Sequence, residues 1–101
     1  MQTICAAIVA KKLIHFHYSI ADDPGYRTVE PHMVAYTKDN NLALSAWYLS
    51  GASASNEGQT WRIYLLEGIS QVQQLTEGFD GPRTGYRSDG GKSFPDVQCG
   101  L

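Results

Sequence analysis

Alternation of apolar and polar side chains with a period of two runs through much of this 101-residue chain and restricts its fold more than any other feature. Ile14, Phe16 and Tyr18 alternate with His15 and His17, so the two sets lie on opposite faces of a strand. Similar extended patterns return as far as residue 75. The sequence therefore predicts a mainly β fold.

Turn signals separate the first extended segments. Residues 22–25, Asp-Asp-Pro-Gly, combine a proline that fixes φ with a glycine that accepts positive φ, so the chain reverses there and residues 26–30 form a hairpin partner. Pro31 lacks an N–H and interrupts the ladder, so residues 33–37 are either a third strand or a bent continuation of the second. A further turn is predicted at residues 38–41.

The next apolar run, residues 42–49, is buried on both faces and is predicted to be a central strand. The small polar residues 51–60 predict a surface loop. Residues 61–66 alternate again, and residues 72–75 offer a last short strand. Five or six short strands with tight turns favour a small barrel or a half-open sandwich.

The two ends of the chain have different compositions. Apolar residues at helical spacing in residues 1–12 predict a short helix that lies on the strands, because an isolated helix of this length is marginal in water. From residue 81 onward Gly, Ser, Asp and Pro predominate, which predicts a loosely held tail. Only its start, residues 79–87, carries aromatic side chains large enough to anchor it. We therefore expect a domain over 1–80 and a C-terminal extension over 81–101.

Size, charge and cysteine content exclude several classes of protein. The chain has room for one core, and its formal net charge of −2 gives no strong field for a polyanion, so a nucleic-acid site would be a local patch. No apolar run approaches the roughly 18 residues of a membrane span. Residues 1–9 do not form a secretory leader, so we expect a cytoplasmic protein with Cys5 and Cys99 reduced.

Five short motifs in a fixed order, HFHY, YRTVEPH, AWYL, WRIYLLEGI and F..PR.GY, resemble the WYL domain family over residues 4–87. The family tripeptide aligns either with residues 47–49 or with residues 42–44. The resemblance implies an SH3-like or Sm-like barrel that senses a ligand in bacterial transcription regulation or defence, with nucleic acid or a nucleotide-like molecule as the ligand. Such regulators place a DNA-binding winged helix before the domain. Nothing before Leu13 is long enough for one, so we expect the chain either to act alone on single strands or a small molecule, or to depend on a partner protein for DNA binding.

The resemblance also implies a set of ligand-binding residues. Four match polar positions of the family, namely Tyr18, Arg27, His32 and Arg62, and the last motif adds Arg83, Tyr86 and Arg87. These side chains suit an anion, because guanidinium groups match phosphate and carboxylate geometry and tyrosine adds a stacking face. In the alternative interpretation Arg27 pairs with Glu30 or another acid and Arg62 only solvates a strand face. Trp47 and Trp61 are expected to pack in or near the core.

Two further classes of function remain open, and catalysis is not among them. A protein-interaction or assembly domain would form an oligomer or bind a partner with little salt dependence. A metal or small-molecule site would centre on His15, His17 and His32, but a convincing third ligand is missing, so no metal is expected. The serines lack a nucleophile motif and the glycine-rich stretch lacks the lysine of a phosphate loop, so we expect neither an enzyme nor a cofactor.

Overall fold

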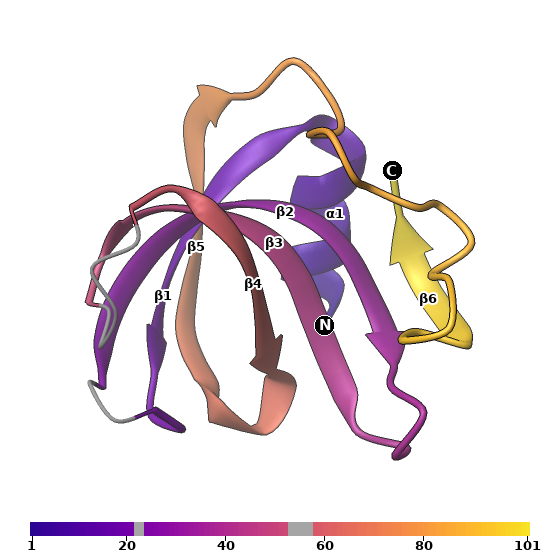
Figure 1. Ribbon diagram of the computed structural model, residues 1–101. Helices are drawn as coiled ribbons and strands as arrows, with labels where there is room; N and C mark the ends of the chain where they lie inside the picture. Colours follow the sequence, from indigo (N-terminus) through magenta and orange to yellow (C-terminus); the bar gives the residue numbers. More distant parts are fainter. Residues whose placement is uncertain (22–23, 53–57) are drawn as a thin grey trace.

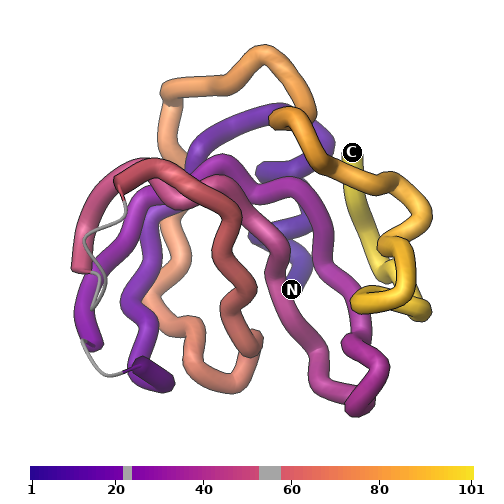
Figure 2. The backbone as a smooth tube through the Cα atoms, viewed as in Figure 1, coloured from indigo at the N-terminus to yellow at the C-terminus, as the bar shows by residue number. Residues whose placement is uncertain are grey.

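The alternating segment after the first helix builds the centre of the molecule. The computed structural model describes residues 1–21, 24–52 and 58–101. Within these ranges one helix and six antiparallel strands form a curved sheet around an apolar core (Figure 1, Figure 2). The elements are α1 (Gln2–Ala10), β1 (Lys12–Tyr18), β2 (Gly25–Tyr36), β3 (Leu42–Gly51), β4 (Thr60–Leu65), β5 (Ile69–Gly78) and β6 (Asp96–Gly100), with a 3-10 turn at Leu66–Gly68 before β5.

Strand β2 organises the sheet. The hydrogen-bonded order is β4-β3-β2-β1-β5, and β6 pairs with the second half of β2, so β2 has three partner strands along its length. The mainly β prediction is confirmed, including the central position of β3. No ladder joins β4 to β5 among the described residues, so a closed SH3-like or Sm-like barrel stays a prediction.

Pro31 bends β2 without ending it. The pairing with β3 shifts register between Pro31 and Met33, where the missing N–H would otherwise disturb the ladder. The bent continuation is therefore the correct alternative for residues 33–37. The turn at 38–41 is confirmed, because the Thr37 amide donates to the Asn41 carbonyl at 2.9 Å. The other predicted turn and the loop include residues 22–23 and 53–57, which lie outside the described residues.

The predicted N-terminal helix is confirmed as α1, which covers one side of the sheet. Ile4, Ala7 and Ile8 are buried and contribute to one cluster with the inward side chains of the strands. Phe16 is fully buried at the centre of this cluster and meets Tyr64 edge to face, with ring centroids 5.1 Å apart. Burial of this face supplies the stability that so short a helix lacks by itself.

The C-terminal segment, residues 79–100, differs from two expectations based on the sequence. It is not loose over its whole length, because β6 pairs with β2 from Met33 to Tyr36. Cys5 and Cys99 are not free thiols but form a disulfide with a Cα separation of 5.9 Å. Both predictions were wrong because ladder hydrogen bonds use the backbone and leave little mark on composition, and because 94 residues separate the cysteines in sequence.

The fold bears on the predicted anchoring of residues 79–87, but it does not test the domain boundary or the cellular location. The start of the C-terminal segment is anchored by aromatic rings as predicted, since Phe79 stacks on His32 with centroids 5.4 Å apart. The boundary between residues 80 and 81 stays a prediction, as does the cytoplasmic location. Over the described part of the chain, none of the helices has the length and apolar character needed to cross a membrane.

Candidate functional site

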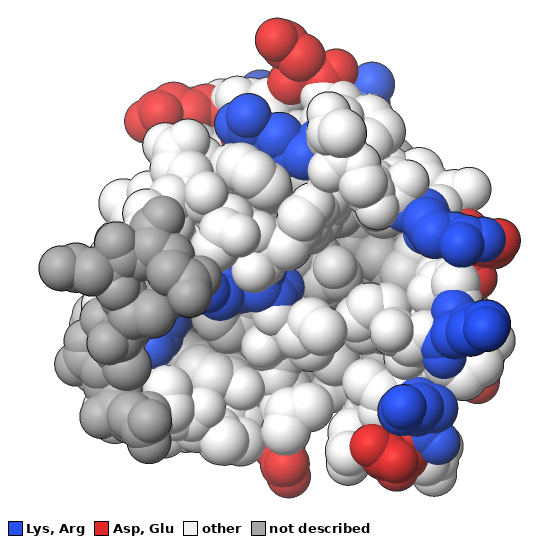
Figure 3. Space-filling model, in the orientation of Figure 1, with Lys and Arg blue, Asp and Glu red and all other residues white. Residues whose placement is uncertain are grey.

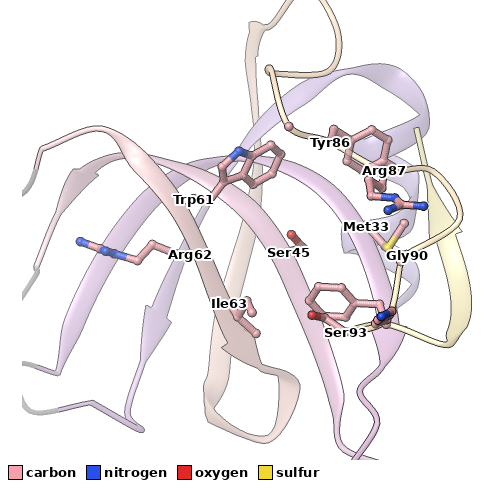
Figure 4. A pocket seen from close by; sticks show the side chains of 13 residues that line it. Met33, Ser45, Trp61, Arg62, Ile63, Tyr86, Arg87, Gly90 and Ser93 are labelled. Atoms are coloured by element: carbon pink, nitrogen blue, oxygen red, sulfur yellow. The ribbon is translucent and has the colours of Figure 1, made fainter.

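Side chains along β4 point alternately to the inner and the outer face of the sheet. Tyr64 points into the core and is only 3% exposed, whereas Ile63 beside it is 56% exposed on the outer face. Figure 4 shows the same division earlier in the strand, with the side chains of Trp61 and Arg62 on opposite sides of it. The inner and outer faces therefore hold separate groups of candidate residues.

The inner group surrounds Arg27, which is only 4% exposed. Its guanidinium donates to the carbonyl of Gly25 at 2.9 Å and to that of Tyr18 at 3.4 Å. The guanidinium carbon also lies 5.3 Å from the centroid of the Tyr18 ring and 6.0 Å from that of Tyr64. Arg27 is thus packed as part of the fold, and a ligand could reach its guanidinium only after a rearrangement.

The rest of the inner group extends this packing of cations on aromatic rings. The guanidinium carbon of Arg62 lies 5.4 Å from the centroid of Tyr48. Burial raises the pKa of Tyr64 to about 12, against the opposing influence of the charges on Arg27 and Arg62. The Tyr64 hydroxyl is buried and has no hydrogen-bond partner among the described residues. Tyr18 completes the group by accepting the Leu65 amide on its hydroxyl at 2.9 Å.

The outer group surrounds His32, which is completely buried. Its Nδ1 lies 2.8 Å from the Glu30 carbonyl and its Nε2 accepts the Arg83 amide at 3.1 Å, so Nδ1 carries the proton. Burial is the largest influence on the His32 pKa and lowers it, which keeps the ring neutral. Three aromatic rings enclose the imidazole within 5.4 Å between centroids, those of Trp61, Phe79 and Tyr86.

Arg83 holds the C-terminal segment to this group through a bidentate ion pair. Its Nε and Nη2 donate to the two carboxylate oxygens of Glu30 at 2.7 and 2.8 Å. Its guanidinium carbon lies 5.0 Å from the centroid of Trp47. Glu30 therefore pairs with Arg83. The alternative interpretation, which named Glu30 as one partner for Arg27, is wrong about this partner. The contacts of the Arg83 guanidinium therefore stabilise the fold.

A groove of about 690 Å³ lies on the outer face, between β4 and the C-terminal segment. Met33 and Ser45 form its floor, and Figure 4 shows Trp61 on one side with Tyr86 and Arg87 on the other. None of the described residues that line it is acidic, and Figure 3 shows Lys and Arg side chains on both sides of the hollowed face. The lining consists of Met33, Ser45, Trp61, Arg62, Ile63, Gly85, Tyr86, Arg87, Gly90, Gly91, Lys92, Ser93 and Phe94.

Three of the seven predicted residues reach this groove, namely Arg62, Tyr86 and Arg87. Arg62 contributes to the wall only near its backbone, because its guanidinium points away from the groove in Figure 4. His32 and Arg83 lie behind the groove as supports. Sequence reasoning missed Lys92 and Phe94, although Phe94 is one of the few apolar side chains after residue 81.

The three histidines do not gather in one place. His15 stacks on the Tyr26 ring and His17 meets it edge to face, each 5.1 Å from it between centroids, while both nitrogens of His32 are engaged in the outer group. His15 Nδ1 also lies 3.0 Å from the Thr28 hydroxyl. Among the described residues, no three His, Cys, Asp or Glu side chains gather in a way that could hold a metal ion.

Comparison with known families identifies the class of protein. The family model described as the WYL domain matches residues 1–74, and the chain belongs to this family. WYL domains are generally ligand-sensing modules in regulators. No curated protein and no solved structure matches the chain. The matched region supplies the floor of the groove and its β4 side, while the opposite wall, from residue 85 to 94, lies beyond it.

Proposed function

We propose that this WYL domain senses an anionic ligand with a planar ring, a nucleotide-like molecule or a short single strand of nucleic acid, and binds it in the groove. The observation that carries the proposal is the combination of aromatic rings and cationic side chains without any acid in the lining. The chain as a whole has a net charge of −2, so this excess of positive charge is local. The groove volume also falls within the usual range for small-molecule sites.

Each part of the ligand has matching side chains. Trp61, Tyr86 and Phe94 present ring surface on which a base can stack, an interaction worth about 1–3 kcal/mol per base. Lys92 and Arg87 stand on the rim as phosphate contacts. Arg87 pairs with Asp89 at 3.1 Å, but both side chains are about two-thirds exposed, and water and salt weaken such pairs. A phosphate can therefore replace Asp89 at little cost.

The clusters around Arg27 and Arg83 have a supporting part in this proposal. Arg83 fixes the wall through Glu30, and Arg27 fixes the inner face of the sheet. The proposed activity is binding without catalysis and without a cofactor. In a transcription regulator or a defence system, a partner protein would then carry the DNA-binding step.

Fluorescence anisotropy of a fluorescein-labelled oligo-dT and of a labelled adenine nucleotide, each at two salt concentrations, tests the proposal. Arg87→Ala/Lys92→Ala should weaken oligo-dT binding and lower the salt slope by about 0.7 for each phosphate that is no longer neutralised. Phe94→Leu keeps the apolar volume but removes the ring face, so it should weaken both probes. Lys12→Ala is the matched control, because it removes a cation whose Nζ is bound to the Thr76 carbonyl on the β1–β5 side.

Two results would count against the groove. One is the absence of binding to either probe at tens of micromolar protein, a concentration that a sensing site of useful affinity should not require. The other is the same loss of binding free energy per charge removed in Lys12→Ala and in Arg87→Ala/Lys92→Ala, since this would mean that only overall charge matters.

Exposed Ile63 on the edge strand β4 favours a second candidate, an assembly domain. β4 has one neighbour in the sheet order, β3, and Ile63 is 56% exposed on its outer face. This candidate predicts self-association that changes little with salt and that Ile63→Lys abolishes. Sedimentation velocity over a range of protein concentrations distinguishes the two functions.

A further inference from the structure

The Cys5–Cys99 disulfide joins the two parts of the molecule that build the groove. Cys5 belongs to α1, which is fixed to the core by Ile4 and Ile8. Cys99 belongs to β6, the last strand of the C-terminal segment. Figure 1 shows α1 and β6 on the same side of the molecule, and the two elements are in contact. The bond therefore ties the segment that carries the groove wall to the family-matched body of the domain.

The groove wall itself has little contact with the core. Between residues 85 and 94, Gly90 alone is buried, and the hydrogen bonds of this stretch are largely internal turns. The Gly90 amide donates to the Arg87 carbonyl at 3.0 Å, and the Phe94 amide donates to the Gly90 carbonyl at 3.1 Å. The position of the wall therefore depends on how its two ends are held.

The first end of the wall is held by side chains. Phe79 stacks on His32, and Arg83 pairs with Glu30, whose side chain is 7% exposed. The Tyr86 hydroxyl also lies 3.3 Å from the His32 carbonyl and 3.1 Å from the Leu101 carbonyl. These contacts do not involve sulfur, so a change in redox state leaves this end in place.

The second end is held by one short strand, by the disulfide and by Leu101, whose amide donates to the His32 carbonyl at 3.0 Å. β6 has five residues, its outward side chains are exposed, and its pairing with β2 changes register between Val34 and Ala35. A short edge strand with an interrupted ladder opens at a low free-energy cost compared with the core. The covalent bond at Cys99 supplies the permanent attachment of this end.

We infer that the disulfide is a redox switch for the groove, an inference that rests on the proposed ligand site. A cellular dithiol supplies two electrons and two protons, the Cys5–Cys99 bond breaks to give two thiols, and the dithiol becomes a disulfide. β6 then separates more readily from β2, and the wall from residue 85 to 94 loses its second support. The reduced protein binds the ligand weakly, and reoxidation restores binding.

Hydrogen–deuterium exchange of the whole chain, oxidised and after reduction with dithiothreitol, tests the switch without any ligand. Amides of residues 85–100 should exchange about tenfold faster or more in the reduced protein, and faster than those of β1 and β3, which open only with global unfolding. Cys5→Ser/Cys99→Ser should match the reduced protein and show no response to dithiothreitol. Unchanged exchange in residues 85–100, or exchange there no faster than in β1 and β3 of the reduced protein, would overturn the inference.

The oligo-dT probe, measured in both redox states, separates failure of the switch from failure of the function. The inference expects affinity to fall about tenfold or more on reduction and to return on reoxidation. Equal affinity in both states would overturn the switch and leave the binding function intact. If the oxidised protein does not bind while exchange still accelerates in residues 85–100, the proposed function fails and the redox-controlled opening stands.

Discussion

Two arginine–carboxylate pairs in the C-terminal segment provide a controlled test of how this segment is held. Arg83 contacts Glu30 through two hydrogen bonds of 2.7 and 2.8 Å, and Arg87 contacts Asp89 through two of 3.2 and 3.1 Å. The environments differ, because the Glu30 side chain is 7% exposed and that of Asp89 is 67% exposed. Replacing either arginine by alanine removes the same charge but should have very different consequences.

Arg83→Ala leaves a carboxylate buried without its partner. Removing one member of a buried ion pair costs about 3–5 kcal/mol, but the Arg83 side chain is 41% exposed, so water can solvate part of the vacated site. We expect the free energy of unfolding to fall by about 2–3 kcal/mol, and the melting temperature by roughly 10–20 °C. Arg87→Ala breaks an exposed pair and should leave the free energy of unfolding nearly unchanged.

Urea unfolding followed by tryptophan fluorescence measures both variants under the same conditions. A cycle of Arg83→Ala, Glu30→Gln and the double variant isolates the coupling between the two side chains, which should exceed about 1 kcal/mol. Comparable destabilisation by Arg83→Ala and Arg87→Ala, or a coupling near zero, would refute the conclusion that the Glu30 pair anchors the segment.

Three further predictions concern other parts of the structure. Burial lowers the pKa of His32 below 6.5, so the unfolded chain binds more protons than the folded protein as the pH falls. The free energy of unfolding should therefore decrease as the pH is lowered from about 6.5 toward the folded-state pKa. Urea titrations at several pH values should show this dependence in the unmodified protein and not in His32→Gln. Cys5→Ser/Cys99→Ser opens a loop of 94 residues and should lower the unfolding free energy by about 3–5 kcal/mol; calorimetry showing no change would contradict this. Gly51 has φ of 115°, and a Cβ there would collide with the Tyr26 carbonyl, so Gly51→Ala should cost about 2 kcal/mol more than Gly81→Ala, where a Cβ meets nothing within 4 Å. Equal chemical denaturation midpoints for the two glycine variants would show that the close approach is not important.

The sequence was sufficient for most of the local structure, because periodicity reports directly on which side chains are buried. The alternation from Ile14 to Tyr18 predicted β1, and the long apolar run predicted the central strand β3. The spacing of apolar residues predicted α1. The ordered motifs also pointed to the family that the comparison shows. The effect of Pro31 was left open by the sequence, since a missing N–H can either end a strand or bend it.

The arrangement of the candidate site was decided by tertiary structure. Arg27, Arg62 and Arg87 were predicted as members of one binding set, yet pairing of strands places the side chains of Arg27 and Arg62 on the inner face, while Arg87 lines the outer groove. The identity of the partner of Glu30 could not be read from the sequence, because Arg27 is three residues away and Arg83 is 53 residues away.

Sequence by itself determined that this chain is a strand-rich WYL domain with a short helix, since those features depend on local periodicity and on motif order. Only the tertiary structure decided that Cys5 meets Cys99, that the glycine-rich C-terminal segment forms a strand, and that Trp61, Phe94 and Lys92 share one groove. The physical reason is that these contacts join residues far apart in the chain. They use backbone hydrogen bonds and a covalent bond, neither of which leaves a periodic pattern in the sequence.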